Sequence, residues 1–378
     1  MDNQTVGLIA FFLVLTLPKL LERLFIPAGI SALGLGVLSY IFFPFFREDE
    51  VLKFLSVAGI TSLFLFSGLE IKVEDLKSDK KALIKYVVVF LLILFVVSSS
   101  LYLFLDFNIQ ESVIYSLGLV TPSSGFIISS LSFFKMDKDQ EDWVKPRAIV
   151  KEVVSIFLLF IILQIDKPQE LLISTAILAF FFFMIPFLFR LHLKFIAAHT
   201  ENSGVPFLVA ISIVAGVVSK NLGAYYIVGA FIVGVIGSQF LKLVTEKVEK
   251  DLFKSLSSFT SVFLPFYFFH SGVKLSVSGF TMNSVAIGFA LLVFFIPLRL
   301  FIEKYALSNK LEFSILKKLP LSLIPTLVFG LVIVGVLIEK NLLNDSYIYG
   351  LVIYTTVCSA FPLLLYKTQK KNLSLNHK

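Results

Sequence analysis

The segment Thr121-Pro122-Ser123-Ser124-Gly125 interrupts an apolar stretch that covers about residues 112–134. Proline lacks a backbone N–H and glycine weakens a helix, so this stretch is predicted to be a broken helix. A second apolar stretch, at about 313–337, contains Pro320 and, 204 residues after Thr121, the pair Pro325-Thr326. Two apolar helices are thus predicted to be broken at matching places, although prolines also kink membrane helices that have no functional site.

Composition places most of the chain in a lipid bilayer. Of its 378 residues, 57% are hydrophobic and 16% are charged, values that a protein with a polar surface hardly reaches. A bilayer core of about 30 Å needs roughly 20 apolar residues for each helical crossing, and such stretches recur along the chain. The prediction is an all-α polytopic membrane protein. Its thirteen expected spans cover about residues 5–22, 26–43, 51–70, 83–105, 112–134, 146–165, 170–191, 205–220, 223–240, 255–272, 281–303, 313–337 and 346–366.

Lysine and arginine are distributed unequally between the loops on the two sides of these spans. Positive loops stay on the cytoplasmic side, so the side that is poor in these residues is the outer one. This predicts an N-terminus outside and a C-terminus in the cytoplasm, and it accounts for the net charge of +7 without nucleic-acid binding. Of the 33 lysines and arginines, the outer loops hold only Arg47, Lys53, Lys167, Lys220, Lys274 and Lys340.

Motifs of enzyme chemistry are not found in the sequence. The single cysteine, Cys358, lies in the last apolar stretch, so no disulfide or cysteine-based metal site can form within the chain. There is no phosphate-binding loop, histidine-rich metal cluster or Gly-x-Ser-x-Gly nucleophile motif. We therefore expect no enzyme activity, no cofactor and no resident metal ion.

Two pairs of short segments suggest an internal repeat. Phe66-Ser67-Gly68-Leu69-Glu70-Ile71 resembles His270-Ser271-Gly272-Val273-Lys274-Leu275, and Gly36-Val37-Leu38-Ser39 resembles Gly234-Val235-Ile236-Gly237. Members of each pair lie seven spans apart, so the two copies have opposite orientation in the membrane, as in many transporters. The expected domains are a first six-helix inverted repeat at 1–166, a linker helix at 167–204, a second six-helix repeat at 205–368 and a cytoplasmic tail at 369–378.

The most unusual pair of charges within an apolar stretch is Lys151-Glu152. At 1.5 Å per residue, Glu152 lies about 10 Å deep if its helix enters the lipid near Lys145. A charge at the centre of a membrane helix costs about 2.5–3.5 kcal/mol, which favours a buried functional pair; the alternative is that both side chains reach the inner surface. Glu152 shares a helix face with Ser155, whereas Lys151 lies on the neighbouring face and can reach a different partner. Arg299 is a further intramembrane charge, or a cytoplasmic anchor.

Four segments together resemble the monovalent cation/proton antiporter superfamily, most closely its sodium/proton exchangers and Kef-type potassium/proton antiporters. The resemblance covers the whole membrane portion, and we expect no Kef-like cytoplasmic nucleotide-binding domain. The segments are Leu17-Pro18-Lys19-Leu20-Leu21 through Ile26-Pro27 to Gly34-Leu35-Gly36, Leu63-Phe64-Leu65-Phe66-Ser67-Gly68-Leu69-Glu70, Gly229-Ala230-Phe231-Ile232-Val233-Gly234, and Phe263-Leu264-Pro265-Phe266-Tyr267-Phe268-Phe269-His270-Ser271-Gly272.

The resemblance implies an antiporter fold with crossed broken helices, a mobile core domain and a dimerisation domain. It also implies exchange of Na⁺ or K⁺ for protons by alternating access, a homodimer and a bacterial inner membrane location. Arg299 matches a basic residue that often has a charge-compensating role. The expected ion- or proton-binding residues are Glu152, Lys151, Thr121, Ser123 and Ser124, and the expected crossing contains Pro122, Gly125, Pro320, Pro325 and Thr326.

One position departs from the family pattern. Members carry Asp-Asp, Asn-Asp or Gln-Asp where this chain has Lys151-Glu152, so a lysine lies beside a carboxylate that should bind a cation. Two alternatives to exchange therefore stay open: a degenerate antiporter fold that acts as a non-transporting partner or sensor, and an anion transporter or uniporter. The sequence also leaves open Na⁺ against K⁺ and the number of protons exchanged.

Overall fold

The computed structural model describes residues 3–23, 26–71, 80–134, 136–197, 200, 203–241, 245–307 and 315–375, and all regular structure within these ranges is helical. The chain divides into two compact units, and we describe each by itself. Unit 1 contains Met1–Phe43, Asp79–Ser155 and Ser271–Lys378, whereas unit 2 contains Pro44–Ser78 and Ile156–His270.

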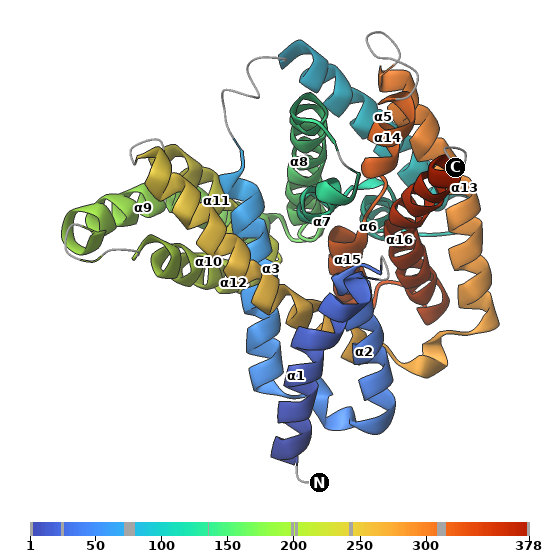
Figure 1. The fold of residues 1–378 in the computed structure, drawn as a ribbon, viewed down its shortest axis with the longest axis horizontal. Coiled ribbons are helices and arrows are strands. Elements are labelled where there is room, and N and C mark those ends of the chain that lie inside the picture. The colour runs from blue at the N-terminus through green and yellow to red at the C-terminus, as the bar shows by residue number, and fades with distance from the viewer. Residues whose placement is uncertain are drawn as a thin grey trace. The chain divides into compact units, whose positions relative to one another are not determined.

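The helices follow the apolar stretches of the sequence (Figure 1). Eight of those described are long and apolar enough to cross a membrane. With each broken helix counted once, the described α-helices make thirteen, as predicted. They are α1 (Asn3–Glu22), α2 (Ala28–Phe42), α3 (Glu50–Leu69), α5 (Lys80–Phe104), α6 (Ile109–Val120), α7 (Ser124–Ser130), α8 (Lys138–Ile162), α9 (Pro168–His192), α10 (Gly204–Asn221), α11 (Tyr226–Leu241), α12 (Glu246–Val273), α13 (Met282–Leu307), α14 (Ile315–Ser322), α15 (Leu327–Lys340) and α16 (Asp345–Leu375).

Large apolar side chains cover the outside of these helices. Phe95, Phe183, Phe289 and Phe294 are all exposed, and Phe183 is 77% exposed. A soluble protein rarely exposes apolar patches of this extent, whereas lipid tails solvate them well. The surface agrees with the composition, and the chain is an integral membrane protein.

Two helices of unit 1 are broken where the sequence predicted. α6 ends before Thr121 and α7 begins at Ser124, while α14 ends at Ser322 and α15 begins at Leu327. The backbone N–H of Ser123 donates to the carbonyl oxygen of Pro325 at 2.9 Å, and the Ser123 hydroxyl accepts from the N–H of Phe329 at 2.9 Å. The two breaks therefore satisfy part of each other's freed backbone groups, and the crossing of broken helices is confirmed.

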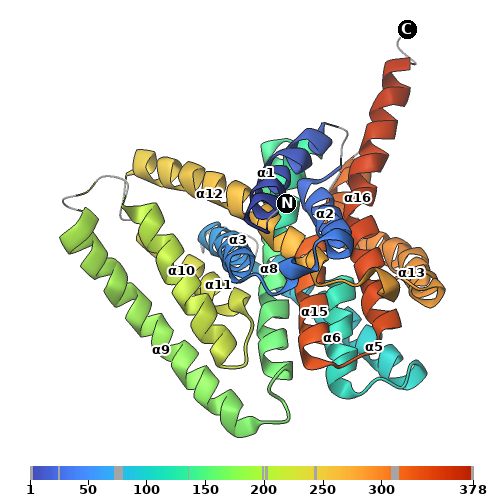
Figure 2. The same ribbon diagram turned by 90° about the horizontal axis from the view of Figure 1, so that it is seen from below.

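Most residues of α15, the helix that follows the second break, are buried within unit 1. α15 packs against α6, α7 and α16 (Figure 2). Its sequence is apolar on all sides, which is typical of a helix with no face toward solvent. Below the breaks, α7, α8 and α14 share an apolar cluster of Ile127, Leu131, Val144, Ala148, Leu319 and Leu323. This packing holds α8 against the interruption between α6 and α7.

Close helix crossings occur at glycines in both units. In unit 2, a Cβ atom added at Gly68 would lie 2.6 Å from the carbonyl oxygen of Phe231 and 2.9 Å from the Cα of Gly234. In unit 1, a Cβ added at Gly272 would lie 3.0 Å from the Cα of Gly36. Only glycine allows the backbones of α3 and α11, and of α2 and α12, to approach this closely.

Three helices are longer than the apolar pattern indicated. α8 begins at Lys138 instead of near residue 146, α12 begins at Glu246 instead of near residue 255, and α16 continues to Leu375. Residues 369–375, expected as part of a cytoplasmic tail, are therefore helical, while 376–378 lie outside the described residues. Hydropathy marks only the part of a helix in lipid, whereas polar residues with good helix propensity extend it further.

Candidate ion-binding site

Glu152 lies on α8 next to the break between α6 and α7. Its side chain is 2% exposed, and its Oε2 atom accepts hydrogen bonds from the backbone N–H of Ser124, at 3.2 Å, and from the Ser124 hydroxyl. The interruption makes this contact possible, because the first N–H groups of α7 have no partner within the helix. A carboxylate held by such donors can bind a proton or a cation without leaving its position.

Hydroxyl groups extend the site along α8. The Oγ1 atom of Thr121 and the Oγ atom of Ser155 are 2.8 Å apart, and both residues are fully buried. Ser155 lies on the same face of α8 as Glu152, as the helical spacing predicted. Carboxylate and hydroxyl oxygens are the groups that hard cations prefer as ligands, so the described oxygens suit a monovalent cation as substrate.

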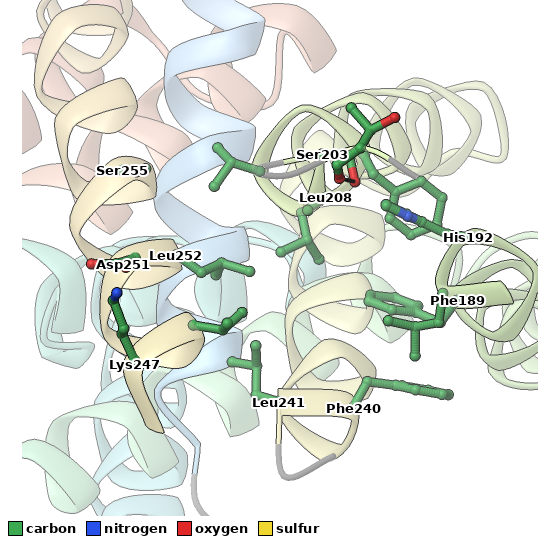
Figure 3. A pocket seen from close by; sticks show the side chains of 16 residues that line it. Phe189, His192, Ser203, Leu208, Phe240, Leu241, Lys247, Asp251, Leu252 and Ser255 are labelled. Atoms are coloured by element: carbon green, nitrogen blue, oxygen red, sulfur yellow. Dashed lines mark hydrogen bonds between the residues drawn. The ribbon is translucent and has the colours of Figure 1, made fainter. Parts of the chain in front are cut away.

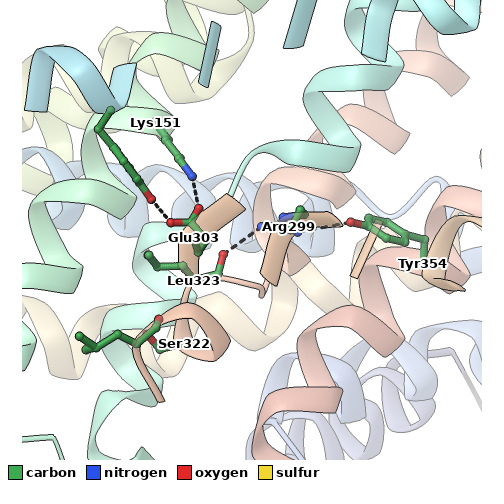
Figure 4. A network of polar contacts seen from close by, with 8 residues as sticks. Lys151, Arg299, Glu303, Ser322, Leu323 and Tyr354 are labelled. Carbon is green, nitrogen blue, oxygen red and sulfur yellow. Dashed lines mark hydrogen bonds and ion pairs between the residues drawn. The ribbon is translucent and has the colours of Figure 1, made fainter. Parts of the chain in front are cut away.

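Lys151 is 6% exposed and points toward Glu303 (Figure 4). Its ammonium forms an ion pair with Glu303 of α13 and lies 4.4 Å from the ring centre of Tyr86. The Tyr86 hydroxyl donates to the other oxygen of Glu303. The alternative in which Lys151 and Glu152 reach the inner surface does not hold, because both side chains are buried.

Arg299 contacts the ends of the broken helices (Figure 4). Its guanidinium donates to the carbonyl oxygen of Leu323 at 2.9 Å, just after α14, and to the hydroxyl of Tyr354 at 3.3 Å. Tyr354 in turn donates to the carbonyl oxygen of Leu119 at 2.8 Å, near the end of α6. The contact with Leu323 places the positive charge against a carbonyl that a continuous helix would have satisfied, and the Tyr354 hydroxyl satisfies the corresponding carbonyl of Leu119. Arg299 was expected to compensate charge at the ion-binding site. Its described contacts are instead with residues of the broken-helix crossing.

The other predicted residues lie at the crossing. Pro122 is buried within the first break and Gly125 lies in the first turn of α7. Pro325 provides the carbonyl that accepts from Ser123, and the Oγ1 atom of Thr326 lies 2.8 Å from that of Thr355. Pro320 lies inside α14, two residues before its end, so it precedes the second break.

Sequence reasoning did not identify Glu303, Tyr86 or Tyr354. Glu303 is the last residue of the expected apolar span 281–303, and in the sequence the two tyrosines resemble other aromatic residues of apolar helices. One signal was present: Glu303 follows Arg299 by four residues, so both belong to one face of a membrane helix. Two charges on one face within lipid call for internal partners.

Unit 2 contains a different concavity, of about 500 Å³, between α9, α10, α11 and α12 (Figure 3). Its lining is mostly apolar, for example Phe189, Leu208 and Phe240. The ring of His192 packs edge-on against Phe207 with 4.0 Å between ring centres. The described lining of this concavity also includes the polar residues Thr200, Ser203, Lys247, Asp251 and Ser255.

Comparison with known proteins assigns the fold and the family. A family model described as "Sodium/hydrogen exchanger, transmembrane" matches residues 7–366. Two relatives are "Probable Na(+)/H(+) antiporter 3" of Methanocaldococcus jannaschii, 26% identical over 71% of each chain, and "Putative Na(+)/H(+) antiporter YjbQ" of Bacillus subtilis, 25% identical over 61% of this chain and 40% of the relative. The solved structure of the sodium proton antiporter MjNhaP1 from Methanocaldococcus jannaschii shares the fold, with a TM-score of 0.69, 14% identity and 99% of each chain covered. The chain belongs to the family of transmembrane sodium/hydrogen exchangers, which are secondary transporters.

Proposed function

We propose that the protein exchanges a monovalent cation, Na⁺ or K⁺, for protons by alternating access, and that Glu152 carries either the cation or the proton. The observation that supports this most directly is the position of Glu152, buried at the crossing of two broken helices and held by two donors of Ser124. In many transporters the substrate site lies where helices are interrupted, because freed backbone groups and polar side chains can bind an ion there.

Competition for a single carboxylate explains coupling without further groups. A proton neutralises Glu152 and so prevents cation binding, while a bound cation disfavours protonation. If only the loaded carboxylate can change sides, each cation that moves one way is matched by protons that move the other way. The hydroxyls of Thr121 and Ser155 provide further oxygens at the break, on the face of α8 that carries Glu152.

The arrangement of the buried charges argues against the two alternative functions. An anion transporter or a non-transporting partner was suggested by cationic side chains near the site. Lys151 is neutralised by Glu303, and Arg299 is engaged by Leu323 and Tyr354. An ammonium that already has its counter-charge, and a guanidinium whose N–H groups are already hydrogen-bonded, do not form an anion site and do not prevent Glu152 from binding a cation.

The test is exchange in liposomes that hold the purified protein. Glu152→Gln should abolish cation-dependent pH change across Na⁺, K⁺ and Li⁺, because glutamine has nearly the same shape but cannot ionise. The matched control is Glu141→Gln on the same helix, where the carboxylate pairs with Lys145 at 2.8 Å and is partly exposed. This control should keep wild-type exchange. Wild-type flux in Glu152→Gln, at an unchanged melting temperature, would rule out the proposed carrier.

Orientation and assembly are part of the same proposal. We place the N-terminus outside and the C-terminus in the cytoplasm of a bacterial inner membrane, which the distribution of lysine and arginine supports. We also propose a homodimer formed by α1 and by α10, its counterpart in the second half. Labelling of cysteines introduced at Asn3 and Lys378 tests the first point, with the buried Cys358 as the unreactive reference. A monomer at all concentrations in mild detergent would contradict the second.

The glycine contacts support the proposed repeats at 1–166 and 205–368. Gly68 of the first half packs on Gly234 of the second, and Gly272 of the second packs on Gly36 of the first. These are the same segments that resemble each other in sequence. A two-fold axis between the halves would exchange one contact with the other, which is the relation expected of inverted repeats.

A further inference from the structure

A second carboxylate lies deep in unit 1, on a helix that the exchange mechanism has not used. Glu303 of α13 is 3% exposed, and both of its oxygens are engaged by groups from other helices (Figure 4). One oxygen pairs with the ammonium of Lys151 on α8, and the other accepts from the hydroxyl of Tyr86 on α5. Lys151 also faces the rings of Tyr86 and Phe90, at 4.4 and 5.6 Å from their centres.

The ammonium of Lys151 needs a counter-charge, because a lone charge within an apolar interior is strongly unfavourable. Only two buried carboxylates are found among the described residues, Glu152 and Glu303. Glu152 is the next residue of the chain, so a flexible lysine side chain could turn toward it if Glu303 were neutral. A lysine bound to Glu152 would take the place of the transported cation.

We propose that Glu303 is a positioning residue that determines cation binding: it holds the Lys151 ammonium in an ion pair on the neighbouring face of α8, so that the Glu152 carboxylate remains available to the transported cation. This inference rests on the proposed function of Glu152. Tyr86 assists by fixing the second oxygen of Glu303 and by facing the ammonium with its ring. Three residues, Lys151, Glu152 and Glu303, then act together in cation binding.

The experiment measures the cation concentration for half-maximal exchange in liposomes. Glu303→Gln should raise it about tenfold or more, because the freed ammonium competes with the cation for Glu152. The double variant Lys151→Gln with Glu303→Gln should recover most of the lost affinity, because both the competing charge and its partner are gone. A pair that only stabilises the fold would lower the amount of folded protein but leave the half-maximal concentration of the folded fraction unchanged.

A milder variant, Tyr86→Phe, keeps the test informative if Glu303→Gln does not fold. Tyr86→Phe removes one donor to Glu303 and should raise the half-maximal cation concentration several-fold. Its matched control is Tyr115→Phe, a buried tyrosine whose hydroxyl donates instead to the carbonyl oxygen of Tyr347 at 3.0 Å. The control should leave this concentration unchanged.

The outcomes separate this inference from the proposed function. Wild-type half-maximal concentrations in folded Glu303→Gln or in Tyr86→Phe would overturn the role of Glu303, and so would a double variant that remains as impaired as the single one. If Glu152→Gln also keeps wild-type exchange, the proposed function itself fails. If Glu152→Gln is inactive, only the positioning role of Glu303 is lost.

Discussion

At the scale of single residues, the hydroxyl of Ser124 connects the break in the helix with the carboxylate. The backbone N–H and the hydroxyl of Ser124 both donate to Glu152, so one residue supplies two hydrogen bonds to a buried charge. Hydrogen bonds to charged groups contribute about 1.5–3 kcal/mol each, more than those between neutral groups. Removal of the hydroxyl leaves the backbone donor, so the site is weakened but not lost.

Ser124→Ala should therefore raise the cation concentration for half-maximal exchange about tenfold at neutral pH. The ionised form of Glu152 loses a donor, so protons compete with the cation more effectively, and the effect should diminish as the pH is raised. The control is Ser130→Ala on the same helix, whose hydroxyl donates only to the carbonyl oxygen of Phe126 at 2.8 Å. Exchange assays over a pH series measure both, and an effect independent of pH would contradict the competition.

The sequence located the charged pair of the site but not its partners. Lys151 and Glu152 are evident because two charges in an apolar helix are costly, and that cost depends on local composition alone. Glu303 is 152 positions away from Lys151, and their contact depends on how α8 and α13 pack. Because adjacent helical side chains point in different directions, the sequence indicates that Lys151 reaches a different partner from Glu152, but it does not identify that partner.

At the scale of elements, two pairs of helices cross at glycines. Overpacking by one methyl group typically costs about 1–3 kcal/mol where the neighbours cannot move, and here the nearest atoms belong to the backbone.

Interruptions of helices are set by local chemistry, so the breaks near Pro122 and Pro325 could be predicted from the sequence. That the two breaks meet, as the hydrogen bond between Ser123 and Pro325 shows, could only be inferred from their spacing of 204 residues, which is also the spacing between Gly68 and Gly272.

Gly68→Ala and Gly272→Ala should each lower the melting temperature by several degrees, because the added Cβ atoms would press against the backbones of α11 and α2. Gly34→Ala is the control, since nothing lies within 4 Å of a Cβ at that position. It should leave stability unchanged or slightly higher, because alanine favours the helix. Thermal unfolding in detergent compares the three variants. Equal melting temperatures for all would contradict the close crossings.

At the scale of the whole molecule, the buried charges balance. Among the described residues, four charged side chains are buried: Lys151, Glu152, Arg299 and Glu303. All four belong to unit 1, and with Glu152 ionised they sum to zero. Lys151 and Glu303 form an ion pair with each other, whereas Glu152 accepts its hydrogen bonds from the uncharged Ser124. Composition predicted a membrane protein, but this balance of charges can be recognised only when the positions of all four side chains are known.

The charge balance predicts an electroneutral exchange of one proton for one cation. The site carries the same net charge whether Glu152 holds a proton or a monovalent cation, so the forward and return steps move equal charge and no net current results. The experiment uses membranes that contain the protein and are adsorbed to an electrode. A sudden increase in the cation concentration should change the luminal pH, which a dye reports, but should produce no sustained current. Glu152→Gln provides the baseline for both signals. A current that accompanies the pH change would mean that Lys151 or Glu303 also exchanges a proton during the cycle, and the one-to-one stoichiometry would be wrong.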